Sequence, residues 1–293
     1  MRRCAGSMNT KHEIRIAHSP DPDDAFMFHA LTTEAFDTGN YSYNHILDDI
    51  ETLNQCALDG EYEVSAVSIH ALPDVLDRYV LMNCGGSMGE GYGPRIVASE
   101  QMSFEDLKKC RIAVPGKKTS AHLALILALG QVDVVFVPFD KIIDVVLNGE
   151  VDAGLVIHEG QLTWSDYGLH LIADLGKWWQ DLWGLPLPLG GNIVRRDLGK
   201  EVYEQVTDDV KKSITYALEN PKPALKFAKQ WGRGIDDNTN REFVDMYVNQ
   251  RTIDYGIDGR RAIRLLLKEG QRIGMIRKDL DVDGLEFIGI PSE

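Results

Sequence analysis

The feature that most constrains the fold is an alternation of short β-prone runs with helical segments from residue 14 to residue 157. Ile14 to His18, Tyr41 to Leu47 and Arg111 to Val114 are strand-like, and each precedes a loop and a helical stretch. The run Val132 to Phe139 is typical of a strand buried on both faces of a parallel sheet. The alternation predicts an α/β fold with mainly parallel sheets and helices on their faces.

The last third of the chain has a different pattern, with long amphipathic helices around residues 201–219, 223–229, 241–251 and 258–273. Apolar residues recur every four positions in the first of these, as one buried helix face requires. We interpret these helices as scaffold.

The net charge of the chain restricts the kinds of molecule it can bind. The 293 residues include 31 Lys and Arg against 45 Asp and Glu, a formal net charge of −14. This field repels nucleic-acid phosphates and anionic membrane surfaces, so we expect neither partner. A small anionic substrate would need a local pocket lined by amides or positive charge. The sequence does not indicate an oligomeric state.

The start of the chain and the cysteines indicate a compartment. Residues 1–13 lack the apolar core of a signal peptide, and no apolar run reaches the roughly 18 residues of a membrane span. We therefore expect a cytoplasmic protein with a disordered tail at 1–13. The cysteines have no zinc-like spacing and are interpreted as buried thiols, with no metal expected: Cys4, Cys56, Cys84 and Cys110.

Four loops follow predicted strands, at the sheet edge where ligands of open α/β folds bind. They are Ser19 to Asp24, Ser68 to His70, Pro115 to Ser120 and Ile157 to Gln161. Together they carry hydroxyls, an imidazole and helix-opening amides, a set suited to binding a carboxylate and moving one proton. The side chains concerned are Ser19, Ser68, Thr119, Ser120 and His158.

Two of these loops allow alternative interpretations. In the first, we expect Asp23 or Asp24 to cap the following helix, and a Mg²⁺ or Ca²⁺ site is the weaker alternative. In Pro115 to Ser120, Gly116 and the lysines could form an anion nest, or the segment could be a capped turn with solvated lysines.

His158 directly follows a predicted buried strand, and a side chain with a pKa near ~6.5 can act as a general base. The alternative is a structural, hydrogen-bonded histidine. His70 and His122 are rivals that we expect to line or support the site. The tryptophans before the Gly184 to Gly191 strip either stack on an aromatic ligand or pack a corner of the core: Trp178, Trp179 and Trp183.

At these loops the chain resembles the menaquinone-biosynthesis enzymes of the futalosine pathway, in their 1,4-dihydroxy-6-naphthoate synthase branch. The resemblance spans about residues 14–270 and follows the family's order. It is carried by S-P-D-P-D-D-A-F-M-F from Ser19, D-D-I-E-T-L-N from Asp48, G-E-G-Y-G-P from Gly89, A-V-P-G-K-K-T-S-A from Ala113, G-E-V-D-A-G-L-V-I-H-E from Gly149 and G-L-P-L-P-L-G-G from Gly184.

The resemblance implies a two-lobed fold like that of type II periplasmic binding proteins, with an interdomain cleft. Lobe 1 would comprise 14–98 plus 193–293 and lobe 2 99–192, with crossings near Ser99 and near Gly191 to Ile193. It also implies a cofactor-independent carbon–carbon lyase that converts cyclic dehypoxanthine futalosine to 1,4-dihydroxy-6-naphthoate. The sugar-derived fragment is lost in this reaction.

The resemblance also implies roles for residues. His158 corresponds to the family's proton acceptor, and the implied substrate contacts are Ala66, Val67, Ser68, Thr119 and Ser120. From the first loop we add Ser19 and Asp24 as substrate-binding residues.

The first loop departs from the family's usual S-P-C-P-N-D-T, because Asp21, Asp23 and Ala25 replace its Cys, Asn and Thr. Acidic residues there would repel an anionic substrate unless they point away. Two alternatives therefore remain: a non-catalytic cytoplasmic binding protein for small anions, and the sister activity, chorismate dehydratase. The G-E-G-Y-G-P and G-L-P-L-P-L-G-G matches favour the naphthoate synthase branch over the latter.

Overall fold

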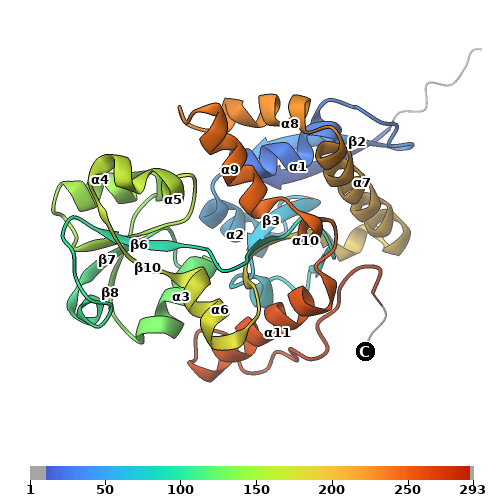
Figure 1. The fold of residues 1–293 in the computed structure, drawn as a ribbon. Coiled ribbons are helices and arrows are strands. Elements are labelled where there is room, and N and C mark those ends of the chain that lie inside the picture. Colours follow the sequence, from blue (N-terminus) through green and yellow to red (C-terminus); the bar gives the residue numbers. More distant parts are fainter. Residues whose placement is uncertain (1–10, 291–293) are drawn as a thin grey trace, which may run out of the picture.

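The computed structural model describes residues 11–290, which form two lobes, each built on one sheet (Figure 1). The first sheet has the order β2-β1-β3-β11-β4, with β5 paired to β11. Its strands are β1 His12–His18, β2 Tyr41–Leu47, β3 Val64–Ser68, β4 Tyr79–Leu81, β5 Ser87–Gly89 and β11 Leu187–Arg195. The second sheet has the order β10-β6-β9-β7-β8. Its strands are β6 Arg95–Ala98, β7 Arg111–Val114, β8 Asp133–Phe136, β9 Ala153–Val156 and β10 His170–Asp174.

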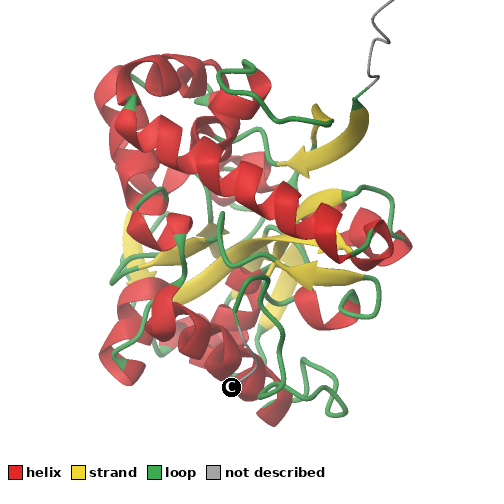
Figure 2. Cartoon of the chain, turned by 90° about the vertical axis from the view of Figure 1, so that its right-hand side faces the viewer, coloured by secondary structure: helices red, strands yellow, loops and turns green. Residues whose placement is uncertain are grey.

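Helices cover the sheets, and Figure 2 shows them above and below the strands. The second lobe carries α3 Ser120–Leu129, α4 Ile142–Leu147, α5 Gly160–Thr163 and α6 Leu175–Trp183. The first lobe carries α1 Pro22–Thr32, α2 Ile50–Asp59, α7 Lys200–Glu219, α8 Pro221–Ala228, α9 Asp237–Tyr247, α10 Gln250–Ile253 and α11 Gly256–Arg272. Across residues 11–290, no helix combines the length and the apolar character that a membrane crossing needs.

The α/β fold is confirmed, and both sheets prove to be mixed. Strands β1, β2 and β3 run parallel to one another, as do β7, β8 and β9, whereas β6 and β11 run antiparallel to their neighbours. The chain passes from the first sheet to the second between residues 89 and 95 and returns to the first between residues 174 and 187. Both crossings come earlier in the sequence than expected. The reason is pairing: Leu187 already pairs with Gly89, and Gly191 pairs with Val67.

Three local expectations need correction. The run Val132 to Phe139 contains the short strand β8, which ends at Phe136 and lies at the edge of its sheet. Phe136 is 48% exposed, because β-branched residues specify a strand and not its place in the sheet. His12 and Glu13 belong to β1 rather than to a disordered tail, while residues 1–10, with Cys4, lie outside the described residues. Of the other cysteines Cys84 is buried, but Cys56 and Cys110 are partly exposed.

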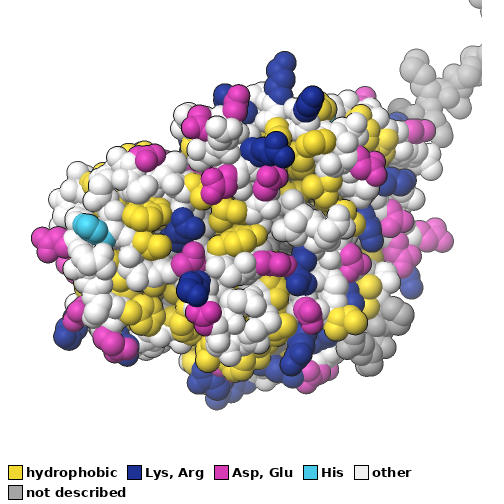
Figure 3. Space-filling model, in the orientation of Figure 1, with side chains coloured by type: hydrophobic (Ala, Val, Ile, Leu, Met, Phe, Trp, Pro, Cys, Tyr) yellow, Lys and Arg dark blue, Asp and Glu magenta, His cyan; other side chains and the backbone are white. Residues whose placement is uncertain are grey.

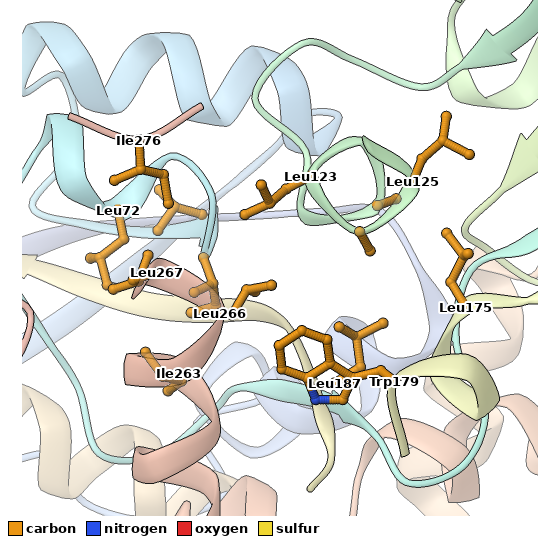
Figure 4. Close-up of a cluster of buried hydrophobic side chains, with 14 of the residues drawn as sticks. Leu72, Leu123, Leu125, Leu175, Trp179, Leu187, Ile263, Leu266, Leu267 and Ile276 are labelled. Carbon is orange, nitrogen blue, oxygen red and sulfur yellow. The ribbon is translucent and has the colours of Figure 1, made fainter. Parts of the chain in front are cut away.

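One hydrophobic cluster spans both lobes on the side of α3, α6 and α11 (Figure 4). It joins Leu123 of α3 to Leu266 of α11, and fully buried Trp179 of α6 lies beside Leu187 of β11. Trp179 Nε1 donates to the carbonyl oxygen of Pro186 at 3.0 Å, so this tryptophan packs the core. Each buried side chain of this size contributes about 1.5–3 kcal/mol, so this cluster holds one side of the lobe junction firmly.

Candidate functional site

A cavity of about 740 Å³, including its open mouth, lies between the lobes at the carboxyl ends of β1, β3, β7 and β9. The first lobe contributes the ends of β1 and β3, and the second contributes the first turn of α3. The wall includes all the substrate-binding residues predicted above: Ser19, Asp24, Ala66, Val67, Ser68, Thr119 and Ser120. The structure therefore brings them together, while their role in binding stays a prediction.

Ser68 ends β3 and is held by Asn54 of α2. Its N–H donates to Asn54 Oδ1 at 2.8 Å, and Asn54 Nδ2 donates to Ser68 Oγ at 3.1 Å. Because Ser68 Oγ accepts this bond, its own proton remains available to a ligand. Asn54 was missed as a supporting residue, although it ends one of the motifs that carry the family resemblance.

The Pro115 to Ser120 loop is a capped turn, as one of the two interpretations expected, and anion binding there stays a prediction. Thr119 caps α3 by accepting from the His122 N–H at 3.2 Å, and Ser120 and Ala121 in the first helical turn line the cavity. Unpaired amides of a helix start therefore border the cavity, which favours an anion. The Lys118 N–H, however, donates to Glu51 Oε2 of α2 at 3.0 Å, so a carboxylate of the protein already occupies part of the nest.

Both rival histidines support this loop. His70 is buried, with Nδ1 3.1 Å from the Thr119 carbonyl oxygen, and its N–H donates to Ser120 Oγ at 3.2 Å. His122 Nδ1 lies 2.9 Å from the Lys117 carbonyl oxygen. Burial lowers the pKa of His70 to about 4, so its ring is neutral and structural.

The three aspartates of the first loop have separate environments. Asp21 occupies the N-cap position of α1 without a side-chain cap bond, so the expected capping by Asp23 or Asp24 is wrong. Asp24 Oδ2 instead accepts from the N–H and Oγ of Ser19 at 2.8 and 2.7 Å. Neither side chain caps the helix because Asp23 and Asp24 lie inside its first turn, and the Asp24 side chain folds back to the preceding loop.

The surroundings of these three aspartates limit how strongly they would repel an anion in the cavity. Burial raises the pKa of Asp24 to about 7, although the Ser19 bonds act in the opposite direction. Burial and the charges of Asp24 and Asp21 raise the pKa of Asp23 well above its usual range. Asp21 is paired with Arg233. In the described part of the chain, no three His, Cys, Asp or Glu side chains form a group that could hold a metal.

His158 follows β9 and is 8% exposed. Its Nε2 lies 3.0 Å from the Phe139 carbonyl oxygen, and its Nδ1 accepts from the Gly160 N–H at 3.0 Å. In the neutral form of the ring, the bond accepted by Nδ1 leaves the proton on Nε2, which faces the Phe139 carbonyl oxygen. Ile157 lines the cavity, whereas His158 is not part of the wall described by the structure. Both ring nitrogens are thus engaged by backbone groups of the second lobe.

Glu159 controls the electrostatics at His158. Its Oε2 lies 3.6 Å from His158 Nδ1. Burial opposes charge on the imidazole, but Glu159, Asp21 and the Phe139 carbonyl group together outweigh it and raise the pKa of His158 above its usual value. Burial acts to raise the pKa of Glu159 as well, but His158 and Arg233 lower it to about 2. Glu159 is therefore a carboxylate that favours a positive His158 ring.

Sequence reasoning missed the contributions of the last third of the chain. Phe243 and Tyr247 of α9, treated as scaffold, line the cavity, and Tyr247 Oη donates to Gln161 Oε1 of α5 at 2.8 Å. Figure 1 shows α5 facing α9 across the division between the lobes. Two aromatics four residues apart on an amphipathic helix have the same pattern as a core face, so no local signal separates the two roles.

The two lobes, with an open cavity between them, form a fold of the periplasmic-binding-protein type. An alkanesulfonate-binding protein of Xanthomonas axonopodis, bound to MOPS, superposes with a TM-score of 0.70 at 14% identity, covering 93% of this chain and 97% of its own. At that identity the similarity concerns the fold alone.

The chain belongs to the menaquinone biosynthesis family, whose model matches residues 14–272. Two similar proteins are named 1,4-dihydroxy-6-naphthoate synthase. That of Thermus thermophilus is 38% identical over 89% of this chain and 95% of its own, and that of Streptomyces coelicolor is 36% identical over 94% and 98%. A crystallised protein of Archaeoglobus fulgidus is 46% identical, with a TM-score of 0.87 over 90% of this chain and 99% of its own.

Proposed function

We propose that this protein converts cyclic dehypoxanthine futalosine to 1,4-dihydroxy-6-naphthoate as a cofactor-independent carbon–carbon lyase. Support comes from the family and from the names of its relatives in Thermus and Streptomyces. The observation that carries the proposal is that every predicted substrate-binding residue lines one interlobe cavity, and that Ile157 of this wall directly precedes His158.

In this proposal the protein binds, encloses and deprotonates its substrate. The Ser68 hydroxyl and the first-turn amides of α3 hold polar groups of the substrate, and lobe closure excludes water. His158 takes a proton from the substrate, and the electron pair released allows the bond to the sugar-derived fragment to break. Glu159, 3.6 Å from Nδ1, stabilises the resulting imidazolium.

The proposed base requires one rearrangement. The ring must give up its bond with the Gly160 N–H before Nδ1 can accept a proton from a substrate. Active-site hydrogen bonds often form only in the substrate complex, so the ligand-free arrangement is compatible with this role.

The test incubates the purified protein with cyclic dehypoxanthine futalosine and follows 1,4-dihydroxy-6-naphthoate by liquid chromatography and mass spectrometry. Replacing the base should lower kcat by about 10²-fold or more, so His158→Ala is compared with the wild type. The matched control is His170→Ala, because His170 is exposed on β10. Turnover that survives in His158→Ala removes this residue from the mechanism.

One observation favours the alternative of a binding protein without catalysis: backbone groups engage both nitrogens of His158. Calorimetry with the same compound distinguishes the two. Binding to the wild type without any product supports the binding protein, and product formation contradicts it.

A further inference from the structure

Arg233 connects the two lobes at the edge of the cavity. It lies in the first lobe, between α8 and α9, and its Nη1 donates to both carboxylate oxygens of Glu159 in the second lobe at 2.9 Å. The same nitrogen lies 2.9 Å from Asp21 Oδ1 in its own lobe. We call this ionic triplet of Asp21, Arg233 and Glu159 the Arg233 bridge. The guanidinium also lies 4.8 Å from the ring centre of Phe139, a second contact across the lobes.

The backbone at Arg233 supports a specific role. Its φ of 46° lies in the left-handed region, which is unfavourable for a residue with a side chain. Glycines stand on both sides of it, and Gly234 also has a positive φ. Unfavourable backbone angles persist where the surroundings require them, and here the loop places an arginine against the opposite lobe.

The two sides of the lobe junction differ in chemistry. On the side of α3, α6 and α11, the continuous hydrophobic cluster holds the lobes together. On the side of α5 and α9, the contacts are polar: the Arg233 bridge and the hydrogen bond between Tyr247 and Gln161. The Arg233 side chain is 31% exposed, so water can replace its partners when the lobes separate. Opening is therefore expected on the α5 and α9 side.

Within residues 11–290, one other ion pair crosses the lobe division, between Lys118 Nζ and Asp74 Oδ2, but it lies at the loop before α3 and not beside α5. Figure 3 shows basic and acidic side chains interspersed over one face of the molecule rather than gathered by sign. Most other ion pairs of the described residues lie within one lobe and are exposed, as Arg241 with Asp245 on α9 is. Glu159, by contrast, is only 5% exposed, and a buried carboxylate without a partner is costly.

We propose that Arg233 is a positioning residue that holds the cleft closed and fixes Glu159 beside His158. The inference rests on the proposed function for its catalytic part. The charged groups that face His158 are Glu159 on its own segment, together with Asp21 and Arg233 from the first lobe. In the closed protein, Arg233 pairs with both carboxylates and offsets part of their charge near His158.

The experiment compares the wild type with Arg233→Gln, Arg233→Lys and the control Arg241→Gln. The control removes the same charge from an exposed pair on α9 that does not touch the second lobe. Small-angle X-ray scattering without ligand measures closure, and thermal unfolding verifies that each variant is folded. We expect Arg233→Gln to have a larger radius of gyration than the wild type, and the control to be unchanged. An equal radius for Arg233→Gln overturns the closing role, whether or not the protein turns over the proposed substrate.

Kinetics on cyclic dehypoxanthine futalosine test the positioning role. Losing one partner of a part-buried charge pair should raise KM about tenfold or more in Arg233→Gln. Arg233→Lys should fall between it and the wild type, because lysine keeps the charge but loses the guanidinium fork. The acidic limb of the kcat profile should move to higher pH in Arg233→Gln, because the freed carboxylates of Glu159 and Asp21 then act on His158 alone. An unchanged KM and an unchanged pH profile contradict the proposal, and failure of the wild type to react would instead contradict the proposed function.

Discussion

Gly116 and Glu51 touch across the lobe division: a methyl group added at residue 116 would lie 2.5 Å from Glu51 Oε2. That carboxylate is fixed there by the Lys118 N–H at 3.0 Å. The glycine of this loop therefore allows a carboxylate of the first lobe to approach the backbone of the second. This contact closes the cleft near α2, as the Arg233 bridge does near α5.

We predict that Gly116→Ala destabilises the protein by about 1–3 kcal/mol, the usual cost of overpacking. The physical reason is that Glu51 must leave the Lys118 N–H to make room. Urea unfolding measures the change. In a Glu51→Ala background the added methyl group meets no carboxylate, so most of the cost should disappear. An equal cost in both backgrounds would show that another contact is responsible.

Asp23 should make stability depend on pH at neutral and alkaline values. Its pKa is raised in the folded state by burial and by Asp24 and Asp21, so the folded protein retains a proton that the unfolded chain has lost. Stability therefore falls as pH rises from the unfolded value of 3.8 toward the raised one. Asp23→Asn removes this loss and should be more stable than the wild type at pH 8 by about 1 kcal/mol or more.

Urea unfolding at intervals from pH 5 to pH 8 checks this prediction. The advantage of Asp23→Asn should shrink toward pH 5, because the cost of keeping the proton in the folded state falls as pH approaches the unfolded value of 3.8. Asp166→Asn, at an exposed position, is the control and should show no such trend. A constant difference at every pH would contradict the assignment of a raised pKa.

The His18 and His45 pair should limit stability in acid. His18 Nε2 lies 3.1 Å from His45 Nδ1, and His18 Nδ1 lies 3.0 Å from the Ser19 carbonyl oxygen. Burial lowers the pKa of His18 to about 3 and that of His45 to about 4. The unfolded chain takes up protons near pH ~6.5, so stability should be lost as pH falls below that value, by about 1 kcal/mol per histidine at pH 5.5.

The measurement compares the free energy of unfolding at pH 7.5 and at pH 5.5. His45→Gln should lose less stability on acidification than the wild type, because one of the histidines with a lowered pKa is gone. His170→Gln, at an exposed position, should lose as much as the wild type. If His45→Gln behaved like the wild type, the histidine pair would not be the source of the acid sensitivity.

Of Trp178, Trp179 and Trp183, we expect Trp179 to be the one whose removal destabilises the protein most. It is fully buried in the cluster that joins the lobes, whereas Trp183 is 38% exposed. Trp179→Ala should destabilise the protein by about 3–5 kcal/mol. Trp183→Ala serves as the control and should cost much less in the same chemical-unfolding measurement. Similar losses in the two variants would disagree with the packing described here.

The α/β fold and the convergence of four loops could be predicted from sequence, since both depend on local patterns. Strand-like runs followed by loops and helices place Ser68 at a strand end and Thr119 at the start of the helix that follows β7, and parallel strand ends meet at one sheet edge. Position within a sheet was not predictable in the same way. The run that forms β8 looked central and lies at an edge, because pairing partners rather than composition decide this.

The sequence by itself determined which segments form strands and helices and which polar loops follow them, because backbone angles and burial periodicity follow from neighbouring residues. Only the tertiary structure decided what those polar groups contact. Arg233 pairs with Asp21, which is 212 positions away in the sequence. The Glu51 carboxylate accepts a hydrogen bond from the Lys118 N–H, and backbone groups contact both ring nitrogens of His158. Such pairings depend on how distant elements pack, and no local pattern specifies which distant group lies within hydrogen-bonding distance.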